Sequence, residues 1–152
     1  NHSDRVKVIE KIKVAVNEAH NFKILIRISP LKYLRMKFIK KDILSLESDD
    51  FAFKRISYQE NLALISKSNA VLDVENPNQT GLTIRTFEVL AMGKKLITTN
   101  YNIKREPFYD DRVIAIIDRQ NPEIRDDFLT DRSEIAIDFS DYSITNWLRK
   151  IF

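Results

Sequence analysis

Apolar residues along the chain follow helical spacing in some segments and form short continuous runs in others, with polar turns between them. The first third of the chain is the less regular part. A β-branched run stopped by Ser29-Pro30 is typical of a strand. The pattern there predicts a helix over 4–19 with Ser3 or Asp4 as N-cap, a strand over 22–28, a short helix over 31–37 and a strand-like piece over 51–56.

From residue 57 onward, helices and strands alternate regularly. Ser57 and Glu60 have the spacing of a capping box, which predicts a helix over 58–68. Gly93 follows a second helical segment in the position of a C-cap. The remaining pattern predicts strands over 70–74, 95–99 and 113–118, a helix over 80–92 after the loop 76–79, and a terminal amphipathic helix over 144–151 that carries Trp147.

This alternation predicts the α/β class, in which a mostly parallel sheet is covered by helices on both faces. We therefore expect a Rossmann-like three-layer sandwich in which 1–152 is one domain. A doubly wound sheet normally begins with a strand, whereas this chain begins with a predicted helix. The chain is then expected to be a fragment that lacks an N-terminal domain and its own first strand. The alternative is a small domain that starts on a helix.

The amino-acid composition limits the kinds of site and the class of protein that the chain can form. Hydrophobic residues make up 43% and charged residues 31% of 152 residues, which is typical of one globular domain. With no cysteine and two histidines, the chain excludes a disulfide scaffold, a thiolate zinc site and a cysteine nucleophile, and it disfavours a histidine-rich metal centre. Neither an apolar run of about 18 residues nor a signal peptide is visible. An intracellular location is the expectation.

The net charge of +3 is unevenly distributed. Residues 1–60 carry 13 basic and 8 acidic side chains, whereas residues 106–152 carry 6 and 11. Such a gradient is compatible with an anionic partner near the N-terminal two thirds, or simply with an uneven solvated surface. The basic and aromatic cluster over 33–41 is compatible with nucleic acid or an anionic membrane, but its shortness favours a solvated edge.

The two glycines, Gly81 and Gly93, bracket one predicted loop and helix. Helix N-termini at the carboxyl ends of parallel strands attract phosphate, because they present unpaired N–H groups and about half a positive charge. Gly81 would let the backbone approach such an anion, and the hydroxyls of Thr80 and Thr83 would donate to it. Arg85 would add a cation, and the Glu88 carboxylate would accept two ribose hydroxyls. The alternative is structural: a turn at Gly81, an N-cap at Thr80 and a solvated or salt-bridged Glu88.

The order Gly-Leu-Thr-x-Arg-Thr-x-Glu-x-x-Ala-x-Gly, from Gly81 to Gly93, precedes a Lys-Lys-Leu-Ile-Thr-Thr-Asn strand. This segment resembles the C-terminal, donor-binding half of GT-B-fold glycosyltransferases, closely over 57–118 and loosely over 4–56. The resemblance implies that Glu88 holds the ribose hydroxyls of a nucleotide sugar and that 81–83 receive the diphosphate or sugar. The donor-binding residues implied are Gln79, Thr80, Gly81, Leu82, Thr83, Arg85 and Glu88.

Thr80 stands where many retaining members have an acid, and Thr83 where they often have a second glycine. The resemblance therefore leaves the catalytic residues, the sugar and the stereochemical outcome unassigned. It implies transfer of a sugar to a bacterial surface polysaccharide or similar acceptor, with no metal or other cofactor and no nucleic-acid partner. The acceptor site would belong to a separate N-terminal domain, so this chain alone would be inactive. The protein would be cytoplasmic, with any peripheral contact at the inner face of the cell membrane made by that other domain. The alternative is a catalytically degenerate Rossmann-like binding or oligomerisation module.

Overall fold

A three-stranded parallel sheet forms the centre of the chain in the computed structural model, which describes residues 2–16, 23–24, 26–35, 37–38, 46, 48–131, 137–139 and 142–151. Its strands are β3 (Ala70–Asp73), β4 (Lys95–Thr98) and β5 (Ile114–Ile116), in the order β3-β4-β5. Asp73 lies opposite Thr98, and Thr98 lies opposite Ile116. The central strand β4 is buried along its whole length, as expected for a parallel strand that is covered on both faces.

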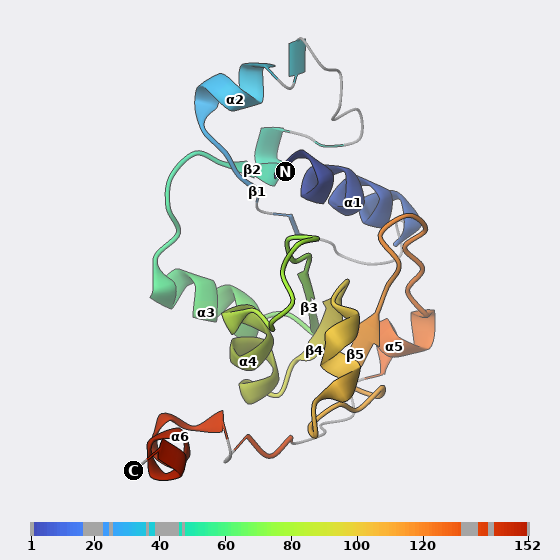
Figure 1. Ribbon diagram of the computed structural model, residues 1–152. Helices are drawn as coiled ribbons and strands as arrows, with labels where there is room; N and C mark the ends of the chain where they lie inside the picture. The colour runs from blue at the N-terminus through green and yellow to red at the C-terminus, as the bar shows by residue number, and fades with distance from the viewer. Residues whose placement is uncertain are drawn as a thin grey trace.

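Helices cover both faces of this sheet (Figure 1). On one face, α3 (Tyr58–Ser66) and α4 (Ile84–Ala91) pack against Leu96 and Ile114. On the other face, α1 (His2–Ala15) and α5 (Asp126–Thr130) pack against Ile97 and Ile117. The α/β class with a small parallel sheet between helices is confirmed, and this arrangement is compatible with a Rossmann-like fold.

A second, smaller parallel sheet lies beyond α1, and it was not separated from the main sheet in the sequence-based prediction. It consists of β1 (Ile26–Arg27) and β2 (Phe51–Ala52), with α2 (Pro30–Arg35) and the short 3-10 helix η2 (Ser48–Asp50) beside them. Helix α1 contributes Val6 to the core of this unit and Ile12 to the core of the main sheet. The strands predicted over 22–28 and 51–56 are therefore much shorter than expected within the described residues.

The N-terminal ends of α1, α3 and α4 agree with the predicted caps in one case of three. The capping box at Ser57 is present: its side chain accepts from the backbone of Glu60, and the Glu60 carboxylate accepts from the Ser57 N–H at 2.7 Å. The prediction that Thr80 starts the next helix is wrong, because α4 begins at Ile84 with Thr83 as its N-cap. The helix at the N-terminus already includes Ser3 and Asp4, so neither is its N-cap.

Gly93 ends α4 as predicted, in the left-handed conformation with φ of 65°. The N–H of Gly93 donates to Leu90 O at 3.0 Å and that of Lys94 donates to Val89 O at 3.1 Å, which is the Schellman pattern. Gly81 is different, because its φ is not positive and nothing would lie within 4 Å of an added Cβ. Gly93 therefore needs the conformational freedom of glycine, whereas the backbone of Gly81 does not.

The C-terminal part is attached through aromatic packing. Phe87 of α4 meets Phe139 and Tyr142 with ring centroids 6.2 and 5.5 Å apart, and the Tyr142 hydroxyl donates to Glu106 at 2.8 Å. Helix α6 (Ile144–Ile151) has the predicted bounds and lies at the end of the molecule opposite α2 (Figure 1).

Candidate functional site

The residues of the candidate site gather at the carboxyl ends of the three parallel strands. Asp73 ends β3, Asn100 follows β4, and Arg119 follows β5. The connection from β3 to β4 runs through the loop 74–83 and then α4, so the N-terminus of α4 lies at this same edge. This edge is where ligands bind in open α/β sheets, because neighbouring connections and helix N-termini converge there.

Thr83 joins the end of β3 to the start of α4. Its hydroxyl oxygen accepts from the backbone N–H of Thr86 at 3.3 Å, and the hydroxyl donates a short hydrogen bond to the Asp73 carboxylate. Both functions of its hydroxyl are occupied here, so the predicted donation from Thr83 to phosphate would require the hydroxyl to leave Asp73. Asp73 itself was not among the predicted site residues.

The Asp73 carboxyl group has a pKa raised above its usual value, chiefly because burial removes water from the charged form. The Thr83 hydrogen bond and the positive charges of Arg85 and Arg5 lower this pKa in part, whereas the negative charge of Glu75 raises it further. Arg5 comes from α1, so cations from two helices act on the same carboxyl group. A partly buried carboxyl of this kind, beside a helix N-terminus, is suited to hydrogen bonding with a polar ligand.

Glu88 and Arg85 form an ion pair one turn inside α4. Arg85 Nη1 and Glu88 Oε2 lie 2.8 Å apart, with side-chain exposures of 32% and 15%. The two atoms are closed off from solvent, and neither has a hydrogen bond of good geometry. Arg85 therefore balances the charge of Glu88, and the carboxylate keeps acceptor capacity because each of its oxygens can accept more than one hydrogen bond. A ligand hydroxyl could take up that unused acceptor capacity if Arg85 turned partly outward.

The loop before α4 is held by asparagines from the next connection. Asn100 Nδ2 donates to Gly81 O at 3.2 Å, and Asn102 Nδ2 donates to Thr80 O at 3.0 Å. Gln79 Nε2 also donates to Gly81 O, at 3.1 Å. Gln79 is thus folded onto its own loop, while Thr80 and Gly81 are exposed and fixed through their carbonyl oxygens. Asn100 and Asn102 were not predicted as site residues, although their place directly after a predicted strand was a usable signal.

Beneath this loop, Glu75, Thr99 and Arg119 form a buried polar cluster. Thr99 Oγ1 donates to Glu75 Oε2 at 2.5 Å, and Arg119 Nη1 donates to Thr99 Oγ1 at 2.9 Å and to Glu75 O at 3.1 Å. Three chain segments that follow three different strands are connected in this way. The cluster was not predicted, and its burial and internal pairing indicate that it fixes the position of the strand ends.

The structure thus brings most of the predicted residues to one edge of the sheet, in two groups. Thr83 and Arg85 lie beside Asp73, Glu88 is paired with Arg85, and Gln79, Thr80 and Gly81 form the adjoining loop. Leu82 is different, because its half-buried side chain packs against the core between the sheet and α4. Only the backbone of Leu82 is therefore available to a ligand, as the resemblance implied.

The described part of the chain contains no group of three or more histidine, aspartate or glutamate side chains arranged to hold a metal ion. Within the same residues, every helix is too short or too polar to cross a bilayer. Comparison of the chain with protein-family models, with curated proteins and with solved structures finds no match.

Proposed function

We propose that this chain is the nucleotide-sugar-binding half of a glycosyltransferase of the GT-B type, which transfers a sugar to a growing bacterial surface polysaccharide or similar acceptor. The observation that carries the proposal is the position of Glu88: a partly buried carboxylate, paired with Arg85, inside the helix that begins at the carboxyl end of β3. The loop in front of that helix supports it, because Thr80 and Gly81 are exposed and held through their carbonyl oxygens, and exposed backbone near a helix N-terminus suits a diphosphate.

In this proposal the predicted residues act through the side chains of Glu88 and Arg85 and through the backbone of the loop before α4. Glu88 accepts ribose hydroxyls, and Arg85 turns from Glu88 toward the diphosphate. The backbone of 81–83, together with the exposed Thr80 and its hydroxyl, receives the diphosphate or sugar. The proposed protein works in the cytoplasm, or at the inner face of the membrane, with an N-terminal acceptor domain, and it needs no metal or other cofactor. The catalytic residues would lie at least partly in that other domain.

The test is an NMR titration of the chain with UDP, GDP, ADP and CMP and with their sugar conjugates. We expect one nucleotide to shift the amides of 80–85 selectively. Glu88→Ala should weaken that binding by about tenfold to a hundredfold, because hydrogen bonds to a charged group contribute about 1.5–3 kcal/mol. Glu88→Gln, which keeps one acceptor oxygen, should lose less. Glu123→Ala, at an exposed loop carboxylate, is the matched control and should bind normally.

Unchanged nucleotide binding by a folded Glu88→Ala variant would refute the assignment of Glu88. The second candidate function is a degenerate Rossmann-like binding or oligomerisation module. The Arg85–Glu88 ion pair favours this candidate, because it accounts for Glu88 without any ligand. Thr80 favours it too, because it replaces the acid that many retaining glycosyltransferases have at this position. This module would show no amide shifts with any nucleotide and no sugar transfer in the full-length protein.

A further inference from the structure

Helix α2 and the two described residues after it expose large apolar side chains. Leu31, Leu34 and Phe38 are 79%, 49% and 70% exposed. Leu31 and Leu34 are three residues apart and so share one face of the helix. Tyr33 holds the other side of α2 in place, since its ring packs edge-on against Phe51 with centroids 4.9 Å apart. The exposed side chains therefore sit on an element that is anchored to the small sheet from its opposite side.

The sequence that contains this segment, residues 26–41, is strongly basic. Residues 26–41 contain six Lys or Arg residues and no Asp or Glu, whereas the whole chain has a net charge of only +3. Arg35 and Lys37 are exposed next to the apolar side chains. Clusters of four to eight basic residues on an amphipathic segment are the pattern that recognises anionic lipid head groups. Exposed apolar residues beside them would enter the boundary between head groups and acyl chains.

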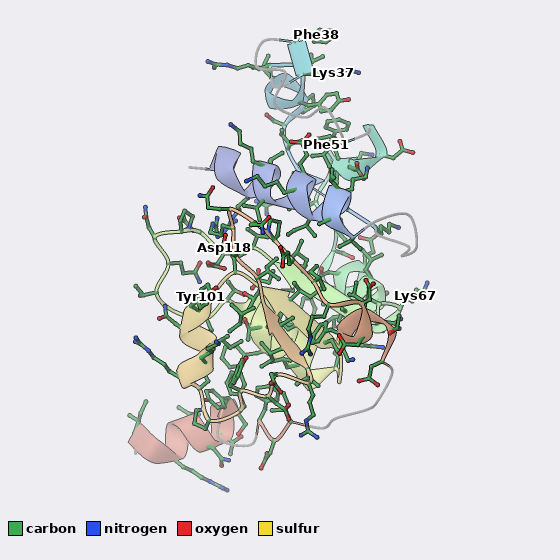
Figure 2. All side chains as sticks on the ribbon, turned by 90° about the vertical axis from the view of Figure 1, so that its right-hand side faces the viewer. Lys37, Phe38, Phe51, Lys67, Tyr101 and Asp118 are labelled. Atoms are coloured by element: carbon green, nitrogen blue, oxygen red, sulfur yellow. The ribbon has the colours of Figure 1, made fainter. Side chains whose placement is uncertain are left out.

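The position of this segment leaves it free to meet a flat surface. Lys37 and Phe38 lie at one extreme of the molecule, beyond Phe51 and far from Tyr101 and Asp118 at the carboxyl edge of the main sheet (Figure 2). Contact at this extreme would leave the candidate site uncovered.

We propose that α2, together with Lys37 and Phe38, docks this chain on an anionic lipid bilayer. The cations bind the head groups, and Leu31, Leu34 and Phe38 insert beside them. Nucleic acid fits less well, because it would use the cations and could stack on Phe38 but would leave Leu31 and Leu34 in water. A second copy of the chain fits less well too, since pairing residues 26–41 of two copies would bring twelve basic residues together. The proposal stands independently of nucleotide-sugar binding.

Vesicle flotation with the whole chain tests the proposal. We expect binding to phosphatidylcholine vesicles that contain phosphatidylserine, weak binding to phosphatidylcholine alone, and release by salt. Leu31→Ser, Leu34→Ser and Phe38→Ser together should weaken binding by about tenfold or more, because the inserted apolar area is lost. The matched control replaces three other exposed apolar residues with serine, namely Val14, Leu148 and Ile151, and should bind like the parent chain.

A site-specific measurement separates insertion from general adhesion. Because the chain has no cysteine, Leu34→Cys can carry a single environment-sensitive fluorophore, with Val14→Cys as the exposed control on α1. We expect a blue shift on anionic vesicles at position 34 and none at 14. Equal binding to both vesicle types, equal shifts at both positions, or serine variants that bind as well as the parent would overturn the proposal. Tight binding of a single-stranded oligonucleotide, unaffected by the serine changes and without vesicle binding, would instead identify a nucleic-acid surface.

Discussion

Asp73 and Asp118 are both aspartates near strand ends, yet their surroundings shift their pKa values in opposite directions. Burial raises the pKa of Asp73, with the Thr83 hydroxyl as its hydrogen-bond donor. The pKa of Asp118 is lowered, because its exposed carboxylate accepts from the backbone N–H groups of Asn121 and Gln120. The first carboxylate therefore opposes folding when it is charged, and the second supports it.

Replacing Asp73 with asparagine should change the pH dependence of stability. The raised pKa means that the folded chain holds the Asp73 proton more tightly than the unfolded chain does. The parent chain should therefore lose stability, relative to Asp73→Asn, as the pH rises from the usual pKa of aspartate to the raised value. Urea unfolding of both proteins at acidic and neutral pH measures this difference.

Asp118→Asn is the control of opposite sign. The parent chain should be the more stable protein at neutral pH, and its advantage should vanish as the pH falls through the lowered pKa. A difference between the parent chain and Asp73→Asn that stayed constant with pH, or that followed the Asp118→Asn trend, would contradict the argument.

At the scale of elements, α4 has two glycines near its ends with different conformations. Gly93 is left-handed and closes the helix, whereas Gly81 belongs to a loop that any residue could form. We expect Gly93→Ala to reduce the free energy of unfolding by about 1–2 kcal/mol, because the left-handed region is unfavourable for alanine. Gly81→Ala should leave stability unchanged or raise it by up to about 1 kcal/mol, through the unfolded state.

Chemical denaturation of the two alanine variants under the same conditions makes this comparison. The change is the same addition of one methyl group, and neither Cβ would contact another group within 4 Å, so that backbone conformation alone distinguishes the two positions. Equal effects would show that the positive φ of Gly93 is not what matters. If the proposed function holds, Gly81→Ala should weaken nucleotide binding despite its normal stability.

The start of α4 could not be predicted from the local sequence. Thr80 and Thr83 are both good N-caps, and neither is followed three residues later by Glu or Gln. Thr83 is the N-cap because contacts outside the helix hold both threonines. Asp73, at the end of β3, accepts a hydrogen bond from the Thr83 hydroxyl, and Asn102 donates to the Thr80 carbonyl oxygen and keeps Thr80 in the loop. Ser57, by contrast, has Glu60 three residues away, and its helix start was predicted correctly. Local signals were sufficient where both partners of a contact lie within one turn.

The same distinction applies to the candidate site. Arg85 and Glu88 share one helix turn, so their proximity followed from spacing alone. Asn100 and Asn102 lie about twenty residues beyond the loop they hold, and only the parallel pairing of β3 with β4 brings them there. The split into two sheets was also missed, because runs such as 22–28 indicate strands but not which strand each will pair with.

At the scale of the whole molecule, α1 connects the two sheets. Val6 belongs to the core of the small sheet, Ile12 to that of the main sheet, and Ile9 contacts both. Ile12 is fully buried, whereas Val14 on the same helix is 69% exposed.

Ile12→Ala should cost about 2–5 kcal/mol, as expected for a large buried side chain cut to alanine. Val14→Ala, the matched control, should stay within about 0.5 kcal/mol of the parent chain. Amide hydrogen exchange gives the spatial test: Ile12→Ala should reduce protection both in β4 and at Ile28, whose N–H donates to Ala52 O in the small unit. Loss of protection in β4 alone would mean that α1 does not couple the two sheets.

The order β3-β4-β5 has a consequence for how the chain is made. Paired residues in the main sheet are close in sequence: Ala70 lies opposite Lys95, and Leu96 lies opposite Ile114. Such short loop closures favour rapid folding. Helix α1 precedes all three strands, so both the sheet and the helices α1, α3 and α4 have been synthesised once the ribosome has passed β5. The contacts of the candidate site all lie before α6, so the site can assemble without the C-terminal segment, which then docks onto a sheet that already exists.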